Sequence, residues 1–217
     1  MTRTVRRTLG AALVAASVAL GGCGLGFDDQ PRALQEEAST TTVADSPSGG
    51  RLTTVLYFVR EGALVPLEQE LPDRSPATLL SALAQPPEPG AVDGLGTSIP
   101  AGTELVDTER DGELLRVDLT SEFDNVVGLS RQQAIGQMVL TVTQQSAVER
   151  LEFLVDGETI TVASPLRGDT TVVDECDFAA LLASPDDVDG AGLPASSIQD
   201  LDERREQLAA DCDSAEG

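Results

Sequence analysis

The sequence predicts an α+β fold, a two-layer sandwich in which two helices cover one face of a mostly antiparallel or mixed sheet. Three observations support this prediction. Short apolar runs alternate with turn signals, two segments have helical periodicity, and the expected elements follow the order β-β-α-β-β-α-β-β over residues 51–165. A chain of 217 residues has room for one such domain with an extension at each end.

The domain begins with a predicted strand pair in Arg51–Leu71. Consecutive apolar residues around Tyr57 are typical of a buried strand. Glu61 and Gly62 mark the turn, and the second strand contains Pro66, which has no N–H to donate to a neighbouring strand. We therefore expect the second strand to lie at a sheet edge.

Two helices are expected, in Ser75–Pro87 and Leu129–Gln145. Ser75 suits the N-cap of the first helix, since a proline follows it and two prolines end the segment. In the second helix, Ser130 and Gln133 fit a capping box. Apolar residues at helical spacing predict a buried face there, made of Ile135, Met138, Val139 and Val142.

Two further pairs of strands are expected, in Glu104–Leu119 and in Arg150–Val162. Each of these segments contains the dipeptide Asp-Gly. Asp-Gly favours the tight turns that join antiparallel strands. In the second pair, Leu151, Phe153 and Val155 occupy alternate positions, so one face of that strand is expected to be buried.

The stretch LGTSIPAGT, Leu95–Thr103, partly matches the G-x-S-x-G elbow of hydrolases around Ser98. That elbow needs a glycine where this chain has Pro100. A serine nucleophile also needs a base, usually histidine and sometimes lysine. The sequence has no histidine, and all 14 of its basic residues are arginine. We therefore expect Ser98 to be structural and predict no catalytic residue and no enzyme activity.

The balance of charge is strongly acidic, with 37 Asp and Glu residues and a net charge of −23. Such a surface repels phosphate backbones, which argues against nucleic-acid binding, and favours a basic partner. No pair of carboxylates is singled out by its spacing. The acidic stretch Ser184–Gly190 has some features of a calcium loop but lacks the bidentate acid at its last position. No metal or cofactor site is predicted.

The amino terminus, residues 1–22, has the basic start and short apolar run of a secretory signal. It ends in LGGC, Leu20–Cys23, which resembles the bacterial lipobox. The resemblance implies that Cys23 is acylated, becomes the mature N-terminus and anchors the chain on the outer face of the plasma membrane. The alternative is an ordinary signal with a chance cysteine. Residues 23–50 are expected to form a flexible tether.

The C-terminal extension, residues 166–217, contains Cys176 and Cys212. Since an exported compartment permits disulfides, we expect these two cysteines to be joined, with free or intermolecular thiols as the alternative. Two thiols without histidine make a zinc site improbable. Residues 196–212 are expected to form a helix capped by Ser197. One face of this helix would carry Ile198, Leu201, Leu208 and Cys212.

Several motifs in order along residues 52–163 resemble those of GerMN domains, a family named from sporulation and spore-germination proteins. They are a YF pair in the first strand, an LVP segment, T-S-I-P-x-G-T, V-D-L-S/T-x-x-F, and V-x-x-V-x-F-x-V-D-G with Leu151 in place of the second valine. In this chain they correspond to Tyr57-Phe58, Leu64–Pro66, Thr97–Thr103, Val117–Phe123 and Val148–Gly157.

This resemblance implies that the stretch around Ser98 is a turn that leads into a strand, and it brings no catalytic residue. Family members include stand-alone lipoproteins and an envelope lipoprotein linked to a sensor kinase, and the fold is likened to ring-building motifs. The expected function is a lipid-anchored, non-enzymatic interaction or scaffold module that binds an envelope protein. The alternatives are a self-assembling envelope subunit and a carboxylate-dependent hydrolase or small-ligand-binding lipoprotein.

Overall fold

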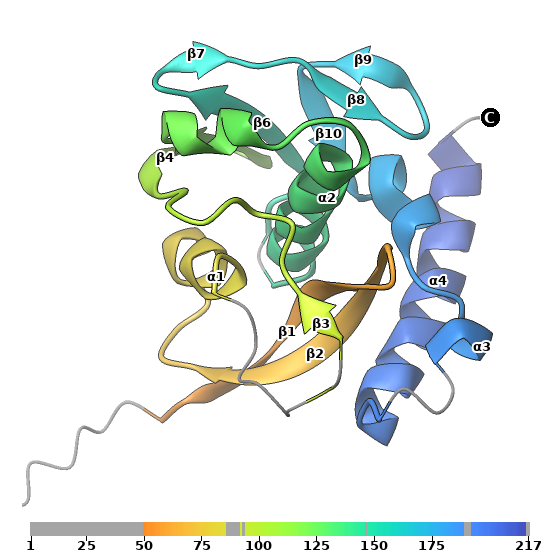
Figure 1. Ribbon diagram of the computed structural model, residues 1–217. Helices are drawn as coiled ribbons and strands as arrows, with labels where there is room; N and C mark the ends of the chain where they lie inside the picture. Colours follow the sequence, from red (N-terminus) through yellow and green to blue (C-terminus); the bar gives the residue numbers. More distant parts are fainter. Residues whose placement is uncertain (1–49, 86–91, 93, 146, 189–191, 216–217) are drawn as a thin grey trace, which may run out of the picture. The chain divides into compact units, whose positions relative to one another are not determined.

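The computed structural model describes residues 50–85, 92, 94–145, 147–188 and 192–215 (Figure 1). The predicted signal sequence, Cys23 and the predicted tether up to residue 49 lie outside these ranges. Lipidation at Cys23 therefore stays a prediction from the sequence.

The first sheet is a hairpin extended by a short third strand, in the order β2-β1-β3. β1 spans Leu52–Arg60, β2 spans Ala63–Leu71 and β3 spans Leu95–Gly96. Glu61 and Gly62, both with positive φ, form the turn between β1 and β2. The predicted strand pair is thus confirmed, and β2 lies at one edge of this sheet, as its proline indicates.

The second sheet has the order β10-β6-β5-β4, with β7 paired to the end of β6. Only β5 and β6 are parallel in this sheet, so it is mixed. Both predicted Asp-Gly hairpins form, as β4–β5 and β6–β7. The strands are β4 Leu105–Asp111, β5 Leu114–Leu119, β6 Arg150–Val155, β7 Glu158–Thr159 and β10 Val172–Asp174. A separate small hairpin pairs β8 Val162–Ser164 with β9 Gly168–Thr170.

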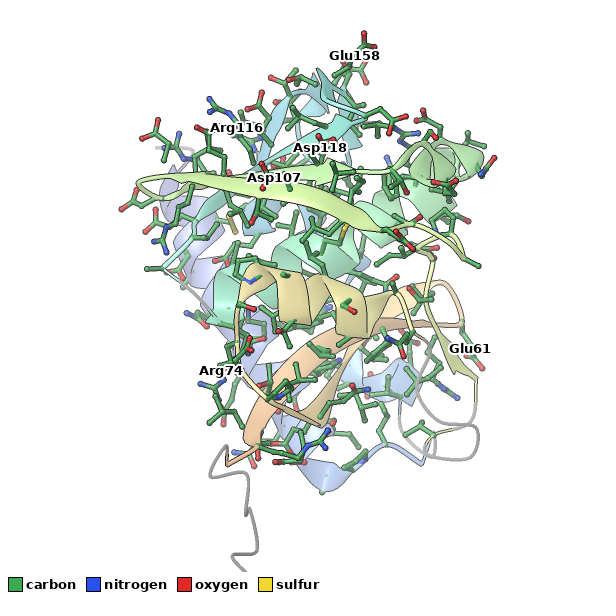
Figure 2. All side chains as sticks on the ribbon, turned by 90° about the vertical axis from the view of Figure 1, so that its left-hand side faces the viewer. Glu61, Arg74, Asp107, Arg116, Asp118 and Glu158 are labelled. Atoms are coloured by element: carbon green, nitrogen blue, oxygen red, sulfur yellow. A yellow bond between two sulfur atoms is a disulfide. The ribbon has the colours of Figure 1, made fainter. Side chains whose placement is uncertain are left out.

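Two helices, α1 (Pro76–Leu83) and α2 (Gly128–Gln145), lie between the first and second sheets, as both views show (Figures 1 and 2). Ten consecutive residues of α2, from Gln133 to Val142, are buried because the helix is covered on more than one side. The predicted α+β class is confirmed. The strands divide between two main sheets rather than forming one, and each sheet has the helices on one face.

All aromatic side chains in the described part of the chain are fully buried. They form the centre of one hydrophobic core together with aliphatic residues from both sheets and both helices. No ring of the described residues is therefore left on the surface to stack on a base or a sugar. The five side chains are Tyr57, Phe58, Phe123, Phe153 and Phe178.

Of the two N-terminal caps predicted for α1 and α2, only the first is confirmed. Ser75 caps α1, since its hydroxyl accepts a hydrogen bond from the N–H of Thr78. The predicted capping box in α2 is wrong: the helix begins at Gly128, so Ser130 lies inside it, and Gln133 bonds elsewhere. Gly128 has a φ of +61°, which favours glycine and sets the start of the helix.

The C-terminal extension folds onto the domain instead of projecting from it. Its main helix, α4 (Ala195–Ala215), contacts β2 and the short helix η2 (Glu175–Leu181), and a one-turn helix, α3 (Pro185–Val188), precedes it. Leu201 and Leu208 are buried on the face predicted from the sequence. The prediction that Ser197 is the N-cap of this helix is wrong, because α4 begins two residues earlier, at Ala195.

A buried carboxylate, Asp177, organises the start of this extension. Its side chain accepts hydrogen bonds from the hydroxyl of Ser164 at 2.5 Å, from Nε of Arg167 at 2.7 Å and from the N–H of Asp174 at 2.9 Å. Burial by itself would raise the pKa of Asp177, but the hydrogen bonds from Arg167 and Ser164 outweigh it, so the pKa lies below its ordinary value. Asp177 therefore stays ionised while the fold is intact.

Gly136 lies where helix α2 packs closely against two neighbouring elements. A methyl group added there would lie 3.0 Å from Cδ1 of Leu64 and 3.2 Å from Cδ1 of Phe178. These side chains come from β2 and η2, so the glycine lets the helix, the first sheet and the C-terminal extension meet at one point.

We expect Gly136→Ala to lower the free energy of unfolding by about 1–3 kcal/mol, because overpacking outweighs the gain of about 1 kcal/mol in helix propensity. Urea denaturation measures this change. Gly96→Ala is the matched control, since no heavy atom lies within 4 Å of the added methyl group. Equal stability of Gly136→Ala and wild type would show that the neighbours of α2 yield without cost.

We expect Asp177→Asn to lower the melting temperature at neutral pH. A depressed native pKa contributes stability above the unfolded value of about 3.9, and that stability is lost as the pH falls through the native pKa. The gap in melting temperature between wild type and variant should therefore narrow below about pH 4. Asp202→Asn on the exposed side of α4 is the control. A gap that does not depend on pH would rule out this charge effect.

Candidate interaction site

Ser98 is a structural residue. Its N–H donates to Oε1 of Gln137 at 2.8 Å, and its hydroxyl donates to Oε1 of Gln133 at 3.1 Å. The loop turns at Pro100, whose carbonyl accepts from the N–H of Thr103 at 3.1 Å. The interpretation of this stretch as a turn that precedes a strand agrees with this geometry, and the chain has no histidine or lysine that could activate the hydroxyl.

The two glutamines belong to a row of polar side chains at four-residue spacing on α2. Besides Ser98, this row contacts the backbone of β1 and of the β1–β2 turn. Nε2 of Gln137 donates to the carbonyl of Tyr57 at 2.9 Å, and Oγ1 of Thr141 accepts from the N–H of Tyr57 at 3.1 Å. Nε2 of Gln133 donates to the carbonyl of Gly62 at 2.6 Å. Side chains of α2 therefore occupy backbone groups along β1 that β3, only two residues long, does not reach.

The sequence pattern predicted the apolar face of α2 but not this row of polar side chains. A signal was present: Gln133, Gln137, Thr141 and Gln145 recur every four residues beside the apolar face of the helix. Polar residues at one helical spacing beside a buried face indicate hydrogen bonds to a neighbouring element.

The other long strand edges are also protected. The edge of β2 is occupied where Leu182 bridges Leu64 and the N–H of Ala183 donates to the carbonyl of Leu64 at 2.9 Å. The outer edge of β4 carries a bulge between Leu105 and Asp107, followed by charged residues (Figure 2). Bulges and charges are the usual means by which an edge strand avoids pairing with another chain.

A groove that we call the α2 groove lies between the first turns of α2 and the β8–β9 hairpin. Its volume is about 430 Å³. Gln132 connects its two sides, because its Nε2 donates to the carbonyl of Ala163 at 2.8 Å. The lining residues include Leu129, Gln132, Ile135, Val162, Ala163 and Asp169.

Two apolar side chains project beside this groove. Val127 is 73% exposed and Leu129 is 57% exposed, the two highest values among the large exposed apolar residues. The turn that carries them is fixed, because Arg131 lies over the ring of Phe123 at 5.1 Å and its Nη1 contacts Oδ1 of Asp124 at 3.2 Å. The two side chains are a small exposed apolar patch on an ordered turn, and contiguous apolar patches are what marks protein-binding surfaces.

The surroundings of this turn are acidic. Asp169 lines the groove, and Glu122 and Asp124 belong to η1 (Ser121–Asn125), the short helix before the turn. The pKa of Glu122 is lowered, mainly by a hydrogen bond from the side chain of Thr120, so this carboxylate is charged at neutral pH. The groove itself is lined by one acidic residue, Asp169, and one basic residue, Arg131, which pairs with Asp124.

A family model described as "Germane: Sporulation and spore germination" matches residues 55–161. Residues 55–161 form a GerMN domain. This range contains most of β1, the strands β2 to β7, the helices α1 and α2, and the exposed turn at Val127. A search of curated proteins returned no match to the sequence.

Solved structures similar to this chain include GerMN domains of the sporulation protein GerM from Bacillus subtilis. The tandem domains share 19% identity over 58% of this chain and 47% of theirs, with a TM-score of 0.47, so this chain spans about half of the tandem structure. The first domain alone shares 18% identity over 57% of this chain and 95% of its own, with a TM-score of 0.45. A candidate lipoprotein from Clostridium perfringens shares 20% identity over 62% of this chain and 94% of its own, with a TM-score of 0.41.

Outside the GerMN domain, the two predicted disulfide cysteines come together. Cys176 in η2 and Cys212 in α4 are bonded, with their Cα atoms 5.6 Å apart. The described residues contain no group of three or more His, Cys, Asp or Glu side chains placed to hold a metal ion. Across the same part of the chain, every helix is too short or too polar to span a membrane.

We expect Gln137→Leu to lower the free energy of unfolding by roughly 2–5 kcal/mol, since it leaves the N–H of Ser98 and the carbonyl of Tyr57 without this buried partner. Ser98→Ala removes only the bond to Gln133 and should cost about 0.5–1.5 kcal/mol. Denaturant titration of both variants measures the difference. A larger loss for Ser98→Ala than for Gln137→Leu would contradict the assigned roles.

Proposed function

We propose that this protein is a non-enzymatic docking module, lipid-anchored at Cys23 outside the cytoplasm, which binds a partner protein at the α2 groove. The observation that carries the proposal is the ordered turn at Val127 and Leu129, which exposes two large apolar side chains beside the α2 groove. The anchor is supported by the LGGC sequence at Leu20–Cys23. The GerMN family, described by sporulation and spore germination, supports a role in that context.

The exposed apolar pair and the net charge of the chain favour a partner with an apolar contact and a basic surface. In the groove itself the charges are mixed, because Asp169 and Arg131 both line it and Arg131 pairs with Asp124. The whole chain is acidic: without the three arginines of the first 22 residues its net charge is −26. Such a field speeds the approach of a basic surface and repels a second copy of this chain.

Self-assembly through strand pairing is the less favoured alternative. Backbone groups of β1 are occupied by side chains of α2, part of the β2 edge by residues 182–183, and β4 is bulged and charged. A hydrolase is also less favoured, because Ser98 is engaged with α2 and the chain lacks a histidine or lysine base.

We expect a photo-cross-linking residue at position 129, in the lipidated protein in native membranes, to form adducts with a different protein. The same probe at Val106 is the matched control, because Val106 is 55% exposed on β4, away from the groove. Mass spectrometry identifies the adducts, and Val127→Ser should weaken those formed at position 129. Adducts with the chain itself would favour the assembly alternative. A lack of protein adducts at position 129 would contradict the proposal and favour a small ligand.

A further inference from the structure

The disulfide between Cys176 and Cys212 is open to solvent on one side. Both cysteines are half-buried, and both line a cavity of about 380 Å³. The other walls of this cavity are mostly apolar and include Leu166, which is 53% exposed, and Leu208 of α4. A thiol can therefore reach the sulfur atoms without unfolding the domain, which a fully buried structural disulfide does not allow.

Two groups near the start of α4, Asp200 and Ser197, oppose the docked position that the disulfide holds. Six acids and two arginines lie within Ala195–Ala215. Near the start of the helix, burial raises the pKa of Asp200, and the carboxylates of Glu68 on β2 and Glu203 raise it further. The hydroxyl of Ser197 is buried and has no hydrogen-bond partner among the described residues. Like charges and an unpaired buried group both weaken docking.

Other contacts favour the docked position. Leu201 and Leu208 are buried, and the hydroxyl of Ser196 donates to Oε2 of Glu68 at 3.0 Å. Arg204 pairs with Glu175, and Nη1 of Arg205 donates to the carbonyls of Leu182 and Ala183 at 3.1 and 3.2 Å. The contacts of Arg205 join α4 to the segment that occupies the β2 edge. Release of α4 would therefore also loosen the cover of that edge.

We propose that Cys176–Cys212 is a thiol–disulfide exchange site, and that its reduction by a dithiol oxidoreductase releases α4 from the β1–β2 hairpin. A thiolate of the reductant attacks one cysteine sulfur, the Cys176–Cys212 bond breaks, and the other cysteine leaves as a thiolate that takes up a proton. The second thiol of the reductant then displaces the first cysteine. Two electrons pass to the protein, which gains two thiols, and the reductant becomes a disulfide. The apolar cavity around Leu166 is the surface that the reductant contacts.

The chain contains its own reporter of this release. Tyr57 is the only tyrosine and there is no tryptophan. Its side chain is fully buried, and its pKa is raised to about 12, mainly by burial, with further effects from Arg204 and Asp200 of α4. These effects place its hydroxyl next to the helix, so tyrosine fluorescence reports whether α4 is docked.

We expect dithiothreitol to increase the quenching of Tyr57 fluorescence by acrylamide several-fold in the detergent-solubilised full-length protein. Hydrogen exchange in α4 should become about tenfold faster or more, while exchange in α2 stays unchanged. The Cys176→Ser/Cys212→Ser variant should match the reduced protein with or without dithiothreitol. Tyr57→Phe shows the fluorescence background.

Three results would overturn the proposal. The bond could resist dithiothreitol while the protein is folded, as shown by thiol alkylation and mass measurement. The disulfide could be reduced while the quenching of Tyr57 fluorescence and hydrogen exchange in α4 stay the same. The bond would then stabilise the fold without controlling the position of α4. Exchange in α2 could rise together with exchange in α4, which would mean that reduction unfolds the whole domain.

Discussion

The hydrogen bonds between α2 and the backbone of β1 are the constraint on which much of the structure depends. A helix placed between two sheets must satisfy every polar group that it buries, and α2 does so with side chains that pair with backbone atoms. Gln137 contacts both the loop at Ser98 and the strand at Tyr57, so one side chain positions two elements. Because the amide of Gln137 donates and accepts at once, a side chain of the same size without both groups cannot replace it.

This arrangement also protects the edges of the two main sheets. Sheet edges recruit other chains most readily, and here the long edges are paired, bulged or charged. The turn where Gly128 starts α2 is different, because it exposes an apolar side chain on each side of the glycine, Val127 and Leu129. The same glycine therefore sets the start of the central helix and the position of the exposed apolar pair.

The C-terminal extension shows how an acidic segment can belong to a folded unit. Asp177 is buried with an arginine partner, and Phe178 next to it enters the core against Gly136. Asp177 and Phe178 therefore hold the beginning of the extension against the domain. Its helix α4 is attached by buried leucines, by polar contacts of Ser196, Arg204 and Arg205, and by the disulfide, while Glu68 on β2 disfavours the charge of Asp200. The extension thus has a fixed part and a part whose docking depends on covalent and charge state.

The sequence by itself determined the local features, which arise from neighbouring residues: the turns at Asp-Gly pairs, the cap at Ser75, the apolar stripes of both helices and the order of the elements. It also argued against serine catalysis at Ser98, because the lack of histidine and lysine is visible without a structure. Only the tertiary structure decided that the strands divide into separate sheets on either side of α2. It also decided that Gln133 bonds to Gly62 and Ser98 instead of capping its helix, and that Val127 stays exposed. These outcomes depend on contacts between residues far apart in the chain, whose energies no local pattern contains.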